Sequence, residues 1–371
     1  MKKTLVALAA FAVVGAAYAQ SSVTLSGIVK GGYASTKFSG GAAGNGNNRS
    51  FADGSSRFIM SGREDLGGGM AGIFQIDTRF RVDDNGGAPT SSPLATGNTF
   101  VGVSGGFGSV RLGKLDTHYC TGSDEHGVRA TALGASSCGI LGYVGSVTAS
   151  IANASRSVNV VRYDLPSALM AGVTGSVTYS TGFAGNDGAI GNAGKGDAWS
   201  AALGYTAGPL SLGASIWRAE AEDRTVPAAP ATRNDQKAWT IFGKWNFGIG
   251  TVGLTYDRSA YERRTTTTFA DNERAAWSVP VTFGVGAGTI LATYTRARSM
   301  DGVAGSGARL WTVGYDHALS KRTSVGISYA NLNNDANASY QLYTTNSLQS
   351  LPTALNGQDQ RQLYVGFRHA F

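Results

Sequence analysis

The chain ends with the stretch Gln362-Leu363-Tyr364-Val365-Gly366-Phe367-Arg368-His369-Ala370-Phe371. On an extended backbone its larger apolar side chains share one face: Leu363, Val365, Phe367 and Phe371. This period of two predicts a β-strand. At the end of a soluble protein such an aromatic strand would invite edge-to-edge aggregation. In a bacterial outer membrane the same strand closes a β-barrel, with its apolar face in lipid. The ending therefore predicts a membrane barrel.

The N-terminus predicts export. Lys2 and Lys3 precede an apolar run from Leu5 to Ala17, which is too short to span a bilayer as a helix. Ala17-Tyr18-Ala19 fits a signal-peptidase site, so residues 1–19 are expected to form a cleaved signal peptide. Residues 20–371 are then expected to form one barrel domain.

Alternating apolar and polar residues recur along the mature chain and predict an all-β, transmembrane, antiparallel up-and-down β-barrel of 16 strands. The expected strands are 22–35, 55–65, 70–81, 97–105, 108–115, 156–164, 170–182, 197–206, 209–219, 237–247, 250–259, 273–283, 288–298, 308–317, 322–332 and 361–371. Pro280 removes a ladder hydrogen bond, so its strand is expected to be bulged or shortened. The alternative is a soluble β-sandwich, which also alternates.

The expected connections alternate between short and long, as in a membrane barrel with short periplasmic turns. Gly67-Gly68-Gly69 is a short turn, whereas residues 38–54 and 333–360 are expected to be long loops. The longest connection is the third long loop, about residues 116–155. A loop of that length usually has a function.

Several motifs resemble the general porins of β-proteobacteria, the neisserial type of Gram-negative porin. They are Val23 to Val29, Ser56-Arg57-Phe58, Gly62 to Gly69, Phe107 to Gly113, Tyr163 to Ser167 and the ending Arg368 to Phe371. The resemblance covers the whole mature chain. It implies a homotrimer of 16-stranded barrels in a Gram-negative outer membrane, with outer-membrane lipid and lipopolysaccharide as expected partners. It also implies that the third loop folds into the lumen, and that Phe371 is the assembly signal read by the barrel assembly machinery.

Charge distribution points to the pore rather than to nucleic acid. The precursor has a net charge of +7, but its cations are spread along strands instead of clustered. Strand parity turns a set of basic side chains toward the lumen: Lys30, Arg57, Arg79, Arg81, Arg111 and Arg156. An acidic set lies in the third loop and is expected to face this wall: Asp116, Asp124 and Glu125. Such an arrangement sets a transverse field that favours one ion sign.

The resemblance adds detail to this expected pore. Arg57 and Arg156 match the family's constriction arginines best, whereas Lys30 stands where the family commonly has an acid. Gly97-Asn98 occupies a position where the family can have a basic pair, which weakens the expected anion preference. For each arginine the alternative is a rim residue that binds lipopolysaccharide or a neighbouring subunit.

The two cysteines, Cys120 and Cys138, both fall in the third loop. Export to an oxidising compartment predicts a disulfide between them. The alternative is two free thiols, because the sequence does not give the distance between their Cα atoms.

The sequence contains no convincing enzymatic motif. Gly108 to Lys114 begins like a P-loop, but Leu115 stands where Ser or Thr must bind magnesium. The four histidines are scattered without metal-ligand spacing, so neither a metal nor a cofactor is expected. We expect a general diffusion porin for small hydrophilic solutes, with a mild preference for anions. The alternatives are a substrate-specific channel with a defined solute-binding site and a non-conducting structural or adhesive barrel.

Overall fold

The computed structural model describes residues 21–41, 44–53, 56–80, 82, 94–118, 136–146, 148–149, 151, 156–183, 196–220, 233–264, 269–342 and 354–371. The expected signal peptide, residues 1–19, lies outside the described residues. Within the described ranges, no helix is long and apolar enough to cross a membrane.

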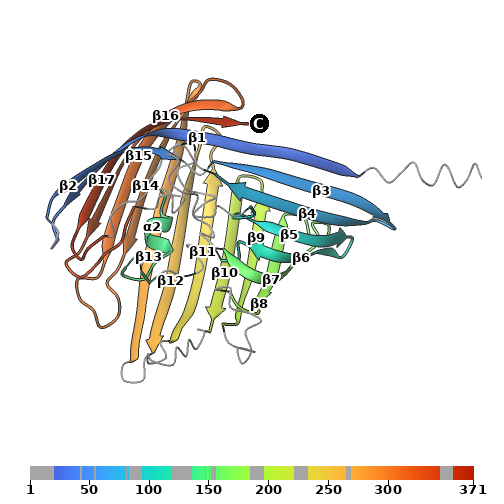
Figure 1. Ribbon diagram of the computed structural model, residues 1–371, viewed down its shortest axis with the longest axis horizontal. Coiled ribbons are helices and arrows are strands. Elements are labelled where there is room, and N and C mark those ends of the chain that lie inside the picture. Colours follow the sequence, from blue (N-terminus) through green and yellow to red (C-terminus); the bar gives the residue numbers. More distant parts are fainter. Residues whose placement is uncertain are drawn as a thin grey trace, which may run out of the picture.

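The described chain is a sheet that closes on itself (Figure 1). Its strands are β1 (Ser22–Ser39), β2 (Gly46–Asp53), β3 (Arg57–Gly67), β4 (Met70–Arg79), β5 (Thr99–Gly105), β6 (Gly108–Leu115), β7 (Ser157–Asp164), β8 (Val173–Ser180), β9 (Ala198–Ala207), β10 (Leu210–Ala219), β11 (Arg233–Asn246), β12 (Gly250–Arg264), β13 (Phe269–Val285), β14 (Gly288–Ala297), β15 (Ala308–Ala318), β16 (Thr323–Asn334) and β17 (Asp359–Ala370). Each strand pairs antiparallel with its neighbours, and β17 pairs with β1 to close the ring. Closure leaves no free edge, as lipid requires.

The seventeen strand segments make up sixteen barrel strands, so the predicted 16-stranded barrel is confirmed. β3 pairs with residues 22–28 of β1, and β2 pairs with residues 31–38 of β1. Together β2 and β3 therefore form one barrel strand beside β1. The expected long loop at residues 38–54 is wrong, because residues 46–53 form β2 and β1 continues to Ser39. The polar sequence of β2 resembles a loop, but its backbone forms ladder hydrogen bonds with that of β1.

The strand with Pro280 is not shortened, since β13 runs through it to Val285. The ladder with β12 steps from the pair Val252–Val281 to the pair Thr255–Ser278, so it is interrupted at the proline. On the other side Pro280 still lies opposite Thr293 of β14. The missing N–H therefore costs pairing with one neighbour only.

Side chains alternate between lipid and lumen as predicted. Leu254 of β12 is 56% exposed on the outside, whereas its neighbour Thr255 is fully buried on the inside. In the last strand Val365 and Phe367 are exposed and Tyr364 is buried. One face is therefore suited to hydrocarbon and the other to water.

The third long loop folds into the barrel. Its short helix α2 (Cys138–Leu141) is buried and contacts β13 and β14, although the loop starts from β6 (Figure 1). Ile140 and Leu141 pack there against Leu310 and Leu332 of the wall. This apolar contact holds the loop across the lumen.

Candidate functional site

Arg274 of β13 fixes the infolded loop to the wall. Its Nε donates to the carbonyl of Tyr143 at 2.9 Å, and its Nη2 donates to the carbonyls of Ile140 and Leu141 at 3.1 and 2.7 Å. These carbonyls lie at the C-terminal end of α2, where backbone acceptors have no partner within the helix. One buried guanidinium thus satisfies three carbonyls of the loop.

Asp257 of β12 neutralises this guanidinium. Nη1 of Arg274 is ion-paired with Oδ1 of Asp257, and both side chains are fully buried. Thr240 donates to the carboxylate at 2.6 Å and Ser259 donates at 2.8 Å. Because the pair is buried and well hydrogen-bonded, it anchors the loop without adding net charge to the lumen.

His118 anchors the start of the same loop. Its Nδ1 lies 2.8 Å from the hydroxyl of Ser215 on β10, and its Nε2 lies 3.5 Å from that of Thr240 on β11. Burial lowers the pKa of His118 to about 4; Asp257 opposes this shift and Arg274 adds to it. The imidazole is therefore neutral at ordinary pH.

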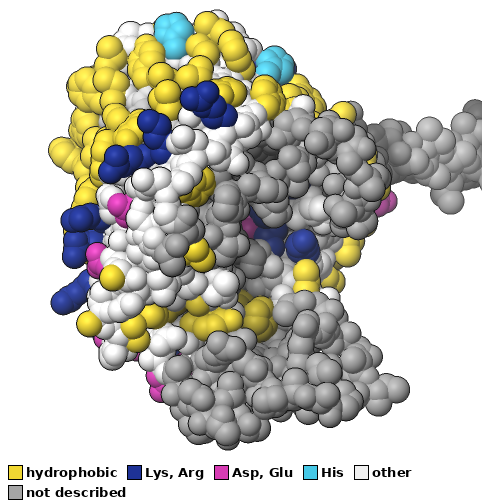
Figure 2. Space-filling model, turned by 60° about the vertical axis from the view of Figure 1, so that its left-hand side comes forward, with side chains coloured by type: hydrophobic (Ala, Val, Ile, Leu, Met, Phe, Trp, Pro, Cys, Tyr) yellow, Lys and Arg dark blue, Asp and Glu magenta, His cyan; other side chains and the backbone are white. Residues whose placement is uncertain are grey.

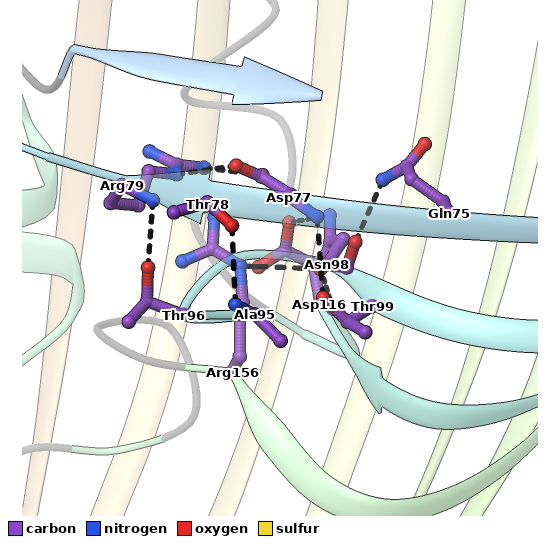
Figure 3. Close-up of polar contacts among 10 residues, drawn as sticks. All are labelled: Gln75, Asp77, Thr78, Arg79, Ala95, Thr96, Asn98, Thr99, Asp116 and Arg156. Carbon is purple, nitrogen blue, oxygen red and sulfur yellow. Dashed lines mark hydrogen bonds and ion pairs between the residues drawn. The ribbon is translucent and has the colours of Figure 1, made fainter. Parts of the chain in front are cut away.

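Asn98, just before β5, is the centre of the polar contacts in Figure 3. Its Nδ2 donates to Oδ2 of Asp116 at 2.7 Å, and its Oδ1 accepts from the backbone N–H of Asp116 at 2.8 Å. Nε of Arg156 also donates to Asn98 Oδ1, at 3.2 Å, and lies 3.3 Å from Oδ1 of Asp116. One amide thus fixes a carboxylate and an arginine together.

Asp116 therefore differs from its expected place. The sequence predicts it across the lumen from the basic wall, but it lies on that wall beside Arg156. The reason is that Asp116 directly follows β6, before the loop leaves for the far side. The negative charge of Asp116 therefore offsets part of the positive charge on this wall, and Asp116 does not lie across the lumen from it.

A second ion pair lies on β4 in the same region. Arg79 binds Asp77 through two parallel contacts of 3.0 Å (Figure 3). Gly97 donates its N–H to the carbonyl of Asp77 at 2.8 Å, and a Cβ at Gly97 would overlap the Asp77 carboxylate. A larger side chain at Gly97 would therefore have to displace the Asp77 carboxylate that holds Arg79.

Arg57 of β3 lies within electrostatic reach of both pairs, that is, of Arg79, Asp77, Arg156 and Asp116. Its Nε has no hydrogen-bond partner among the described residues. Lys114 of β6 interacts electrostatically with Arg156 in the same way. The constriction wall, as we name this group, has four cations and two carboxylates: Arg57, Arg79, Lys114, Arg156, Asp77 and Asp116.

Arg111 belongs to a separate group nearer the turn between β5 and β6. It is ion-paired with Asp164 of β7, and its guanidinium carbon lies 5.2 Å from the ring centre of Phe100. Arg162 shares the same carboxylate at 2.8 Å and donates to the carbonyl of Asp116 at 2.9 Å. Two arginines on one carboxylate leave this group positive.

The structure also places the remaining predicted residues. Lys30 is buried on the inner face of β1, where its N–H donates to the Ser56 hydroxyl at 2.9 Å. Cys138 is disulfide-bonded. Four predicted residues lie outside the described residues: Arg81, Cys120, Asp124 and Glu125. Within the described ranges, no cluster of His, Cys, Asp and Glu could bind a metal ion.

Sequence reasoning missed Asn98, Arg162, Asp257 and Arg274 as site residues. The alternation of the strand places Asp257 on the inner face. A carboxylate that faces the lumen there could have been recognised as a candidate site residue. Arg274 gave a similar signal, because an inward arginine opposite a long loop needs a partner. Asn98 was noted only as standing where the family can have a basic residue, and its role as a link between Asp116 and Arg156 depends on contacts that the sequence does not give.

A closed barrel of sixteen strands, with a charged lumen and a loop folded into it, defines an outer-membrane channel. The family model for Gram-negative porins matches residues 4–338. Outer membrane porin protein 32 of Delftia acidovorans is 30% identical over the full length of both chains. The major outer membrane protein P.IB of Neisseria lactamica is 33% identical over 48% of this chain and 50% of its own.

This chain belongs to the Gram-negative porin family. It is thus a channel of the outer membrane of a Gram-negative bacterium. Among solved structures, an anion-selective porin from Comamonas acidovorans matches with a TM-score of 0.76. That match covers 95% of this chain and 100% of the other, at 24% identity, and supports the fold.

Proposed function

We propose that this porin passes small hydrophilic solutes by diffusion and mildly prefers anions. The observation that carries the preference is the constriction wall, where four cations lie beside only two carboxylates. The similar porin from Comamonas acidovorans is anion-selective, which supports the same sign. The proposed mechanism is sieving and electrostatic filtering, with no chemical reaction and no cofactor.

The wall is suited to filtering because its charges are held in place. Arg79 is fixed by two contacts to Asp77, and Arg156 is fixed by Asn98 and Asp116. Arginine keeps its charge at any ambient pH, so the field is constant. Since a lumen with low-dielectric walls focuses such a field, an excess of cations raises the local concentration of anions.

The test is the reversal potential of single channels in a planar bilayer under a salt gradient. The wild-type channel is expected to give an anion-selective sign. The double variant Arg57→Glu/Arg156→Glu should shift the potential toward cations, because it replaces two lumen cations by carboxylates. Lys321→Glu/Arg322→Glu is a matched control, since it makes the same charge change in the exposed turn before β16. An unchanged potential in the wall variant would overturn the filtering role of these arginines.

The flux of a graded series of neutral sugars tests the sieve. A general pore predicts flux that falls smoothly with solute size and never saturates. A substrate-specific channel instead predicts saturation and block by one solute, and a structural barrel predicts no flux.

We also propose that the porin is a homotrimer and that the assembly machinery recognises Phe371. An exposed apolar pocket of about 500 Å³ on β1, β2 and β17 supports a subunit contact there; Val29, Tyr33, Phe51, Val365 and Phe367 line it. Phe371 is 42% exposed at the end of the closing strand. For the disulfide of Cys138 we propose Cys120 as the partner, because the sequence has two cysteines.

A further inference from the structure

Two outer loops hold the third long loop at the segment just after α2. Ser339, in the loop after β16, donates its N–H to the carbonyl of Gly145 at 3.0 Å, and its hydroxyl donates to that of Ser146 at 3.0 Å. The N–H of Gly145 donates to the hydroxyl of Tyr340 at 2.9 Å. Residues 145 and 146 are therefore fixed from the side of the long loops.

Met300, in the loop after β14, covers the same glycine. A Cβ at Gly145 would lie 2.5 Å from the sulfur of Met300 and 2.6 Å from its methyl carbon, so the thioether packs directly on the glycine backbone. Gly145 has a φ of +74°, a conformation that L side chains rarely adopt. The backbone and the space beside it both require glycine here, and Met300 fills that space.

Met300 also packs against an apolar cluster below the outer loops. Val144 and Ile151 of the third long loop belong to this cluster, together with Trp217 of β10. The thioether is therefore part of the apolar contact that joins the third long loop to the wall. We name Met300, Ser339 and Tyr340 the outer contact residues.

The outer contact residues are themselves held in place. The N–H of Met300 donates to the hydroxyl of Ser306 at 2.7 Å. The side-chain amide of Asn334 donates to the carbonyl of Tyr340 at 2.8 Å and accepts from its N–H at 2.9 Å. Because these backbones are fixed, a chemical change in the side chain of Met300 acts directly on its contact with Gly145.

Met300 lies where a water-sized reagent can reach it. Its side chain is half-buried, and its neighbours Arg298, Ser299 and Asp301 are exposed. In Figure 2 yellow hydrophobic side chains cover much of the upper part of the molecule, and the described surface below them is mostly white. The lower part is the side of the long loops in Figure 1, so this side is suited to water.

Peroxide oxidises a methionine thioether to the sulfoxide. A lone pair of the sulfur attacks one oxygen of hydrogen peroxide, the S–O bond forms and the O–O bond breaks. The departing hydroxide takes the proton from the transferred oxygen and leaves as water. The sulfur loses two electrons, and the peroxide gains them. Cys138 does not compete for the oxidant, because it is already disulfide-bonded.

The sulfoxide does not suit the contact with Gly145. Its oxygen is a polar acceptor, but the N–H of Gly145 beside it already donates to Tyr340. An acceptor without a partner is costly inside an apolar cluster. We therefore expect the oxidised side chain to turn toward water and to uncover Gly145.

We propose that Met300 is a redox-sensitive site at which hydrogen peroxide loosens the third long loop. Oxidation removes one of the outer contacts, whereas Arg274 and the packing of α2 still hold the loop from the wall. The loosened segment fluctuates in the lumen and shortens the open periods of the channel. The change is reversible, because methionine sulfoxide reductases restore the thioether. The proposal uses the pore only as its readout and is independent of its ion preference.

The experiment treats the folded, full-length mature protein in detergent with hydrogen peroxide. Peptide mass spectrometry measures the sulfoxide at each methionine, and planar-bilayer recording then measures how often single channels close. We expect Met300 to be oxidised and closures to become about fourfold more frequent, the factor for one apolar group of methyl size that leaves a buried contact. Treatment with methionine sulfoxide reductases for both sulfoxide epimers should restore the original frequency.

Three variants make the result interpretable. Met300→Leu keeps an apolar side chain without an oxidisable sulfur, so its channels should stay quiet with and without peroxide. Met300→Gln places a polar group there permanently and should close often without peroxide. Met70→Leu/Met170→Leu is the matched control, because both methionines are exposed beside short turns, and it should respond to peroxide like the wild type. Heat-modified mobility on gels checks that each variant is folded.

Three outcomes would overturn the proposal. One is that Met300 stays reduced while Met70 and Met170 are fully oxidised. Another is an unchanged closing frequency after oxidation of Met300. The third is a response of Met300→Leu channels to peroxide that equals that of the wild type, which would place the effect at another residue.

Discussion

The ring of Phe371 lies directly over Gly27, and the two residues exchange backbone hydrogen bonds across the seam of the barrel. Gly27 donates to the Phe371 carbonyl at 3.0 Å, and Phe371 donates to the Gly27 carbonyl at 3.1 Å. A Cβ at Gly27 would overlap the phenyl ring and lie 2.5 Å from the carbonyl oxygen of Arg57. The last residue of the chain thus closes the ring on a glycine of the first strand.

Gly27→Ala should weaken this seam. The phenyl ring can turn away from a new methyl group, but the Arg57 carbonyl belongs to the backbone of β3 and is held in the sheet. Overpacking of this kind typically costs about 1–3 kcal/mol. Urea unfolding in detergent should show the loss. Gly46→Ala is the control, because a Cβ at Gly46 meets no atom within 4 Å. Equal stability of the two variants would contradict the close fit.

Asp116→Asn should make the pore more anion-selective. The carboxylate lies 3.3 Å from Nε of Arg156, so its neutralisation leaves the constriction wall with one compensating charge fewer. The reversal potential under a salt gradient should move further toward the anion limit. Asp301→Asn, in the exposed turn after β14, should leave it nearly unchanged. A shift toward cations would show that Asp116 does not temper this wall.

Arg274→Met should destabilise the barrel and loosen the third loop. It leaves Asp257 as an unpaired buried charge, for which a loss of about 3–5 kcal/mol is expected. The second variant, Arg274→Met/Asp257→Leu, should recover most of that stability, because no buried charge remains. The loop carbonyls of Ile140, Leu141 and Tyr143 still lack their donor, so both variants should show increased open-channel noise. Quiet channels in the double variant would mean that apolar packing alone holds the loop.

His118 predicts a loss of stability in acid. Its pKa is about 4, whereas an ordinary histidine titrates near 6.5. Between these values the unfolded chain binds a proton that the folded chain does not bind. The stabilising contribution is therefore complete above pH 6.5 and is lost as the pH falls toward 4, by about 3 kcal/mol.

The measurement is unfolding by urea at about pH 7 and about pH 4.5, on either side of the ordinary histidine pKa, for the wild type and for His118→Gln. The variant should lose less stability between the two pH values, since glutamine has no proton to gain. His369→Gln is the control, because His369 lies in the exposed end of β17. An equal pH dependence in the wild type and His118→Gln would contradict the burial of a neutral imidazole.

The fold could be predicted from the sequence because a barrel wall repeats one local rule. A period of two sets which side chain faces lipid, and this rule recurs in the strands from β1 to β17. Residues 46–53 were missed because they are mostly polar and begin with Gly46-Asn47-Asn48, residue types typical of loops. Only pairing with β1 makes them a strand.

The site could be predicted less completely. The alternation along each strand places Arg57, Arg79, Arg111 and Arg156 on the inner face. It does not give their positions along the barrel axis or the residues that they contact. Asp116 was expected across the lumen, and only the path of the chain shows that it lies beside Arg156. Arg274 meets Tyr143 across 131 positions of sequence, so no local pattern could connect them.

The sequence by itself determined the barrel and its sixteen strands, because alternation is a property of neighbouring residues. The tertiary structure decided which charges meet, where the third loop is anchored and how Phe371 closes the ring. Those contacts join residues far apart in the chain, and their geometry depends on strand register and on the path of the loop through the lumen.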